Sequence, residues 1–173
     1  MAVGELVRAE LARHDWASLR CGCGDTAEHL PLMFETILEA ATARDMIGYT
    51  LEDHVERNGA LFPCLPPAVA VILAALASGP SPLARGVLLQ TLWSMSGCDT
   101  SFGPPDTIPE DCRSAADRGF WVLVHLGLSG DAEDAEHVAD ICAFFGLGGE
   151  RHADYQRLLR ERMVTKTKRR QRR

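Results

Sequence analysis

Residues 66–96 read PPAVAVILAALA (66–77), SGPSP (78–82) and LARGVLLQTLWSMS (83–96). Arg85 is the only charged side chain between Asn58 and Cys98. Residues 68–77 are apolar all round, which is typical of a helix that other helices surround. The run is about half of the roughly 20 residues that a membrane-spanning helix needs. We therefore expect a buried helical hairpin and no membrane association.

The remaining composition also favours helices. The chain has 173 residues, of which 46% are hydrophobic and only 6% aromatic, and it lacks the Val-Ile-Thr alternation of a half-buried strand. Helical spacing of apolar residues and helix-start signals predict an all-α fold of about eight helices in one domain, residues 1–163. The expected helices cover residues 5–19, 25–41, 50–58, 66–77, 83–96, 107–127, 131–145 and 152–163.

A weak internal repeat accompanies these helices. Ala27-Glu-His-Leu30 and Ala135-Glu-His-Val138 each open an apolar-faced helix, and Glu52-Asp-His-Val55 is a looser copy. Helix pairs recur about every 35–45 residues, the range of helical repeat proteins. Over residues 26–146 the chain resembles a short HEAT-like repeat array. An orthogonal helical bundle is the alternative architecture.

Charge divides the chain into an acidic body and a basic end. Residues 1–150 hold eight arginines and twenty-two acidic residues, a net charge of −14, whereas residues 151–173 hold ten basic and two acidic residues, a net charge of +8. Residues 164–173 offer almost nothing to bury and are expected to be a disordered tail. Such a tail can contact phosphate backbones through Lys166, Lys168, Arg169, Arg170, Arg172 and Arg173.

The six cysteines are scattered at positions 21, 23, 64, 98, 112 and 142. The first residues lack the pattern of a secretory signal, so the sequence predicts a cytoplasmic protein with reduced thiols.

Cys21-Gly-Cys23-Gly is the most unusual of these cysteine positions. Two thiolates this close, with His29 shortly after, can bind a soft metal, so Cys21, Cys23 and His29 are candidate ligands. Structural zinc prefers two to four residues between its cysteines, and a fourth ligand would have to come from Cys64 or Cys98. The alternatives are a tight turn of small residues and a nucleophilic Cys23 paired with His29. No cofactor is expected.

A second candidate site surrounds Trp93, Phe102 and His125. Trp93 precedes a loop rich in Gly and Pro at residues 97–106, Phe102 lies within that loop, and His125 is set among apolar residues and expected to be buried. Together these side chains could line a pocket or contact a partner. The chain carries no P-loop, GxGxxG, HExxH or GxSxG motif, which disfavours an enzyme.

The sequence thus favours a non-enzymatic binding module, such as an inhibitor, immunity-type or regulatory adaptor, whose acidic surface contacts a protein. One alternative is a small helical enzyme or ligand-binding protein with a pocket near Trp93, Phe102 and His125. The other is a nucleic-acid accessory protein that acts through its basic tail.

Overall fold

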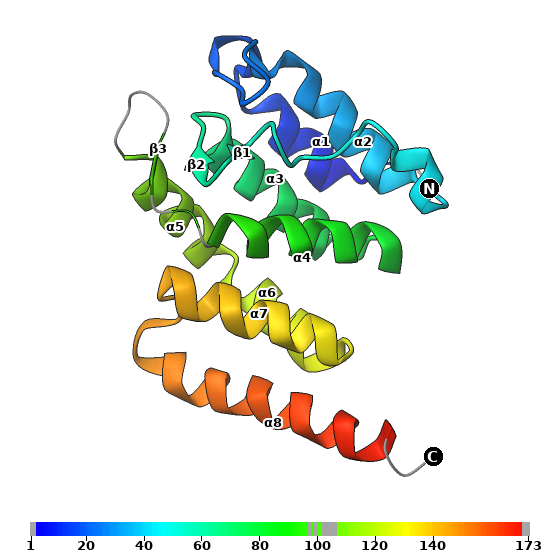
Figure 1. Cartoon of the computed structure of the whole chain (residues 1–173), viewed down its shortest axis with the longest axis vertical. Coiled ribbons are helices and arrows are strands. Elements are labelled where there is room, and N and C mark those ends of the chain that lie inside the picture. The colour runs from blue at the N-terminus through cyan, green and yellow to red at the C-terminus, as the bar shows by residue number, and fades with distance from the viewer. Residues whose placement is uncertain (1–2, 97, 99, 102–106, 171–173) are drawn as a thin grey trace.

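The chain folds into a stack of helices, as a computed structural model shows (Figure 1). The structure describes residues 3–96, 98, 100–101 and 107–170, with backbone only at 96, 100, 101 and 164–170. The eight α-helices in this part of the chain confirm the predicted all-α class. They are α1 (Glu5–Ala12), α2 (Leu30–Glu39), α3 (Leu65–Ala77), α4 (Pro82–Ser96), α5 (Ile108–Arg118), α6 (Phe120–Ser129), α7 (Ala132–Phe145) and α8 (His152–Arg170).

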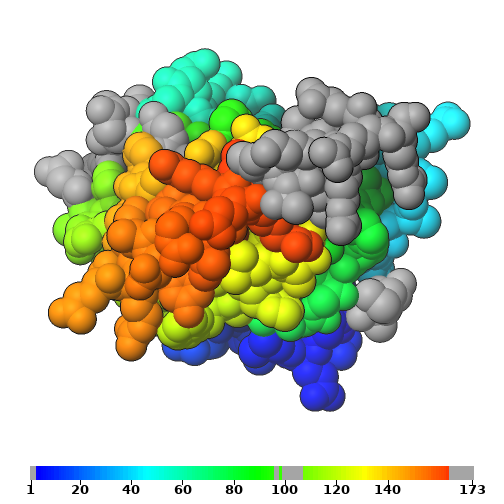
Figure 2. Space-filling view, turned by 90° about the horizontal axis from the view of Figure 1, so that it is seen from below, coloured from blue at the N-terminus to red at the C-terminus, as the bar shows by residue number. Residues whose placement is uncertain are grey.

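The helices follow one another along the long axis of the molecule. In Figure 1, α1 and α2 lie at one end, α3 and α4 in the middle, and α6 and α7 precede α8 at the other end. α3 packs against α1 and α5, α4 packs against α7, and α7 packs against α8. Figure 2, seen from the last helix, shows α8 lying across α6 and α7. None of the described helices combines the length and apolar character that a membrane span requires.

The central hairpin is buried as predicted in its first helix and only partly in its second. Ala68, Val69, Val71 and Ile72 of α3 are completely buried. α4 buries Leu88, Leu89 and Leu92, whereas 40% of Trp93 is exposed. Burying one such aliphatic side chain contributes about 1.5–3 kcal/mol, so α3 and one face of α4 stabilise the middle of the stack.

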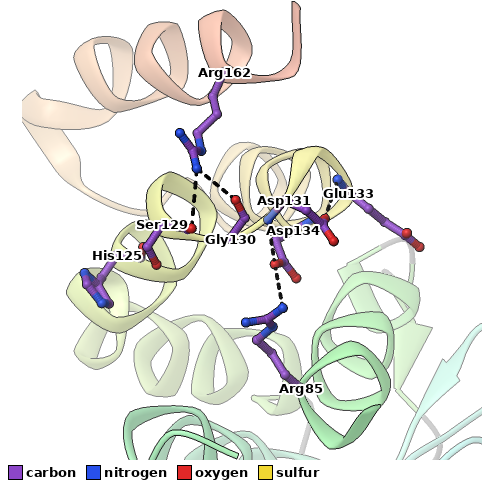
Figure 3. A network of polar contacts seen from close by, with 8 residues as sticks. All are labelled: Arg85, His125, Ser129, Gly130, Asp131, Glu133, Asp134 and Arg162. Atoms are coloured by element: carbon purple, nitrogen blue, oxygen red, sulfur yellow. Dashed lines mark hydrogen bonds and ion pairs between the residues drawn. The ribbon is translucent and has the colours of Figure 1, made fainter. Parts of the chain in front are cut away.

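Polar contacts join α4, α7 and α8 around the turn between α6 and α7 (Figure 3). Asp131 caps α7 by accepting hydrogen bonds from the Glu133 and Asp134 amides at 2.9 and 3.0 Å. Arg85 of α4 forms a 3.1 Å ion pair with the buried Asp134 carboxylate. From α8, Arg162 donates to the Gly130 carbonyl at 2.9 Å. Arg85 and Arg162 thus connect the turn between α6 and α7 to α4 on one side and to α8 on the other.

The helix expected at residues 50–58 is wrong. This segment forms turns, and β1 (Glu56–Arg57) then pairs antiparallel with β2 (Ala60–Leu61). Asn58 and Gly59 both have positive φ, at 53° and 78°, as in a two-residue hairpin turn. Asn-Gly is the strongest short hairpin signal, and the expectation of a helix ending at Gly59 overlooked it. β2 also pairs in parallel with β3 (Thr100–Ser101), so the structure contains a small sheet where none was expected.

Several helix boundaries also differ from expectation. The helix predicted over 5–19 ends at Ala12, and the helix predicted over 25–41 is shorter, from Leu30 to Glu39. The single helix predicted over 107–127 is divided into α5 and α6 at Gly119, where a Cβ would collide with the side chain of Leu73 on α3. The backbone of α8 continues to Arg170, although residues 164–173 were expected to be disordered. Basic residues favour the C-terminal end of a helix because of its dipole, which accounts for this extension. Residues 171–173 lie outside the described part of the chain.

Candidate metal centre

Cys21, Cys23, His29 and His54 lie together at the side of the α1–α2 end of the molecule. One ligand atom from each residue lies within 4.8 Å of the corresponding atoms of the other three. Cys21 is buried, Cys23 is exposed and both histidines are half-buried. The structure therefore brings the three predicted ligands together and adds a fourth that sequence reasoning did not assign to the site.

The distances within this cluster approach those of a tetrahedral zinc site. The Cys21 Sγ atom lies 3.3 Å from His54 Nδ1 and 3.6 Å from His29 Nε2. Zinc bonds of about 2.3 Å to sulfur and 2.0–2.1 Å to nitrogen place such atoms about 3.5 Å apart at a tetrahedral angle. His29 Nε2 and His54 Nδ1 are 2.8 Å apart, at hydrogen-bond distance. Two nitrogen ligands of a tetrahedral zinc ion are about 3.3 Å apart, so the two rings would separate slightly to bind one ion.

A tight turn presents the two cysteines. Arg20 and Thr26 pair across it as an isolated antiparallel bridge, and the Cys21 amide donates to the Asp25 carbonyl at 3.0 Å. Gly24 has a φ of 101°, a conformation that favours glycine. The turn leads into a 3₁₀ turn (Ala27–His29), which places His29 immediately before α2. Local sequence alone thus brings Cys21, Cys23 and His29 near one another.

His54 reaches the site because two loops pack backbone against backbone. The Gly22 amide donates to the His54 carbonyl at 2.7 Å, and Arg57 Nη1 donates to the Gly22 carbonyl at 3.1 Å. A Cβ on Gly22 would collide with the carbonyl oxygen of Asp53. Asp53 itself has a φ of 65°, which turns the chain so that His54 faces the cysteines. Glycine at position 22 is therefore required for the close approach.

Cys64 adjoins the cluster without being one of the four ligands. It precedes α3, is completely buried, and its Sγ atom lies 3.5 Å from the His54 carbonyl oxygen. Cys98, the other cysteine considered as a fourth ligand, instead lies 3.7 Å from the Ser94 carbonyl oxygen. The fourth candidate ligand is thus His54, and neither of these cysteines takes that place.

The environment of Cys21 favours a thiolate. A hydrogen bond with the Cys64 thiol is the main cause that lowers the pKa of Cys21 to about 4, although burial acts in the opposite direction. The same hydrogen bond, followed by burial, raises the pKa of Cys64. By contrast, burial raises the pKa of Cys112 and of Cys142 to about 12. Only a deprotonated cysteine binds a metal, so Cys21 is suited to be a ligand.

Of the second candidate site, the structure describes Trp93 and His125. Trp93 Nε1 donates to Asp140 Oδ2 of α7 at 3.0 Å, and its ring stands 5.7 Å from that of His137. His125 was expected to be buried, yet it is exposed on α6 because its neighbours Leu123, Val124 and Gly127 occupy the opposite, inward face. In Figure 3 its ring points away from Arg85 and Asp134. Phe102 lies outside the described residues.

The side chains of the basic tail residues also lie outside the described part of the chain, so contact through the tail stays a prediction.

No protein family, curated protein or solved structure matches this chain.

Proposed function

We propose that Cys21, Cys23, His29 and His54 bind one zinc ion that has a structural role. The observation that carries this proposal is the convergence of four sulfur and nitrogen donors from three separate segments within 4.8 Å. Sulfur and nitrogen donors suit zinc, whereas calcium and magnesium prefer oxygen. Two thiolates and two neutral imidazoles also balance the charge of a divalent ion, whereas Cu⁺ would leave an excess negative charge.

Four protein ligands close the tetrahedron and leave no position open for a substrate, as in structural zinc sites. The ion would connect the 20–26 turn, the start of α2 and the loop that precedes β1. This loop lies within a long stretch between α2 and α3 that has little regular secondary structure. A zinc ion would thus stabilise the part of the molecule that has the fewest helical hydrogen bonds.

Metal content tests this proposal. Protein purified without a chelator is expected to contain one zinc ion per chain by elemental mass spectrometry. Replacing zinc by cobalt should give the visible absorption of a tetrahedral site with thiolate ligands. Cys23→Ser and His29→Ala should each weaken zinc binding by more than the roughly 10–100-fold that loss of an outer-shell partner costs.

Two matched variants control for these substitutions. His125→Ala removes an exposed histidine on α6, and Cys142→Ala removes a buried thiol of α7. In Figure 1, α3 and α4 separate these two helices from the α1–α2 end. Each control should retain one zinc ion per chain. Wild-type protein that contains no stoichiometric zinc, and acquires none on titration, would contradict the proposal.

We further propose that the zinc-stabilised helical array binds another protein through its acidic surface, as an adaptor or inhibitor. The net charge of −14 on residues 1–150 supports this role, because such a surface attracts a basic partner. The pairing of helices, which resembles that of HEAT-like arrays, supports it by analogy only. The alternative, a small-molecule pocket near Trp93, Phe102 and His125, has less support. Trp93 is hydrogen-bonded to Asp140, and His125 is exposed.

Affinity capture from host lysate tests the adaptor role. Full-length protein and protein lacking residues 165–173 are each used with and without nuclease. We expect both to retain the same protein, and we expect added salt to release it because the attraction is electrostatic. Retention of nucleic acid alone, lost with residues 165–173, would contradict the adaptor role and favour the nucleic-acid alternative.

A further inference from the structure

The metal cluster contains one more thiol than a tetrahedral ion requires. Cys64 lies behind the four ligands, and its Sγ atom is 3.5 Å from the His54 carbonyl oxygen. The Cys21 Sγ atom is 3.4 Å from the same oxygen. The sulfur atoms of Cys21, a proposed ligand, and of Cys64, which is not a ligand, thus both lie next to the His54 carbonyl oxygen. The two cysteines are 43 positions apart in the sequence.

We infer that this pair makes the zinc centre sensitive to peroxide: oxidation joins Cys21 to Cys64 and releases the ion. The inference rests on the proposed zinc site and names its regulation. Cys23 is exposed and the two histidines are half-buried, whereas Cys21 and Cys64 are buried. Oxidation therefore requires that a molecule as small as hydrogen peroxide enters beside Cys23 to reach the Cys21 sulfur.

The chemistry balances in two steps. The Cys21 sulfur attacks one peroxide oxygen, the O–O bond breaks, and the departing hydroxide takes up a proton and leaves as water, which gives a sulfenic acid at Cys21. The Cys64 sulfur then attacks the Cys21 sulfur, the S–O bond breaks, and the hydroxyl leaves with the Cys64 proton as a second water. Two electrons pass from the two sulfur atoms to one peroxide molecule, and one disulfide forms.

The geometry favours Cys64 over Cys23 as the second sulfur. A Cys21–Cys23 disulfide would close a very small ring across Gly22, whose amide and carbonyl are held by His54 and Arg57. Cys64 approaches Cys21 from a different segment, so their disulfide leaves these backbone contacts in place. Zinc would then keep only three ligands, with one negative charge in place of two, and would dissociate.

The experiment compares wild-type protein with Cys64→Ser and with the control Cys142→Ser, each loaded with zinc. Zinc per chain is measured before oxidation, which tests the zinc site itself. Hydrogen peroxide is then added, and released zinc is followed with a colorimetric chelator. We expect Cys64→Ser to release zinc at least about tenfold more slowly than wild type, because its sulfenic acid has no thiol to resolve it at once. Cys142→Ser should match wild type.

Peptide mapping of the oxidised wild-type protein identifies the bond. We expect a disulfide between the peptides that contain Cys21 and Cys64, and we expect dithiothreitol to restore zinc binding. Equal release rates in wild type and Cys64→Ser, or a disulfide between Cys21 and Cys23, would overturn the inference while leaving the zinc site intact. Absence of zinc before oxidation would instead overturn the zinc site.

Discussion

Removal of zinc is expected to lower the free energy of unfolding by about 4 kcal/mol, measured against protein in free zinc at 1,000 times the dissociation constant. The reason is mass action, because the four ligands converge only in the folded chain. For a chain of this length, 1 kcal/mol corresponds to about 2–4 °C, so the melting temperature should fall by about 8–16 °C. Thermal unfolding with and without a strong chelator measures the effect.

Zinc removal should destabilise the segments around the metal site more than the rest of the molecule. Backbone amides of the 20–26 turn and of β1 and β2 should exchange hydrogen faster after zinc removal, because the ion connects these segments. Amides of α7, which packs against α4, α6 and α8, should change little. His54→Ala serves as the control, since a chelator should no longer shift its melting temperature. An unchanged melting temperature of wild type after zinc removal would refute a structural role for the ion.

Gly22→Ala is expected to separate the two loops that form the metal site. The added methyl group would collide with the Asp53 carbonyl oxygen and lie 3.1 Å from the His54 carbonyl oxygen, which accepts the Gly22 amide. Overpacking of this kind costs about 1–3 kcal/mol. Displacement of His54 should also weaken zinc binding by about 10–100-fold, as loss of outer-shell support does elsewhere. Chemical denaturation and competition with a chromophoric zinc chelator measure the two effects.

Gly86→Ala is the matched control for this substitution. Gly86 lies within α4, and a Cβ there would meet no atom within 4 Å apart from the adjoining residues and backbone of its own helix. Alanine in an exposed helix is more stable than glycine by about 0.5–1 kcal/mol, so this variant should be slightly stabilised and should bind zinc normally. If Gly22→Ala bound zinc as tightly as wild type and unfolded at the same denaturant concentration, the proposed contact between the loops would be wrong.

Local patterns in the sequence predicted the helical class and much of the core. The start of α7 follows from Asp131, a capping residue directly before an amphipathic run, and the structure shows its hydrogen bonds to the next residues. The apolar run 68–77 predicted the buried α3. These predictions hold because capping and periodicity act between residues that are close in the chain. The Asn58-Gly59 hairpin was equally local and was missed because Gly59 was interpreted as a helix end.

The sequence by itself also determined that Cys21, Cys23 and His29 lie near one another, because a tight turn and the start of α2 hold all three. Only the tertiary structure decided that His54 completes the set and that Cys64 lies behind it. It likewise decided that one helix ends and the next begins at Gly119, against which the Leu73 side chain of α3 packs closely. These contacts join residues 25 to 46 positions apart, and they form only because packing brings separate segments together, an effect that no local pattern encodes.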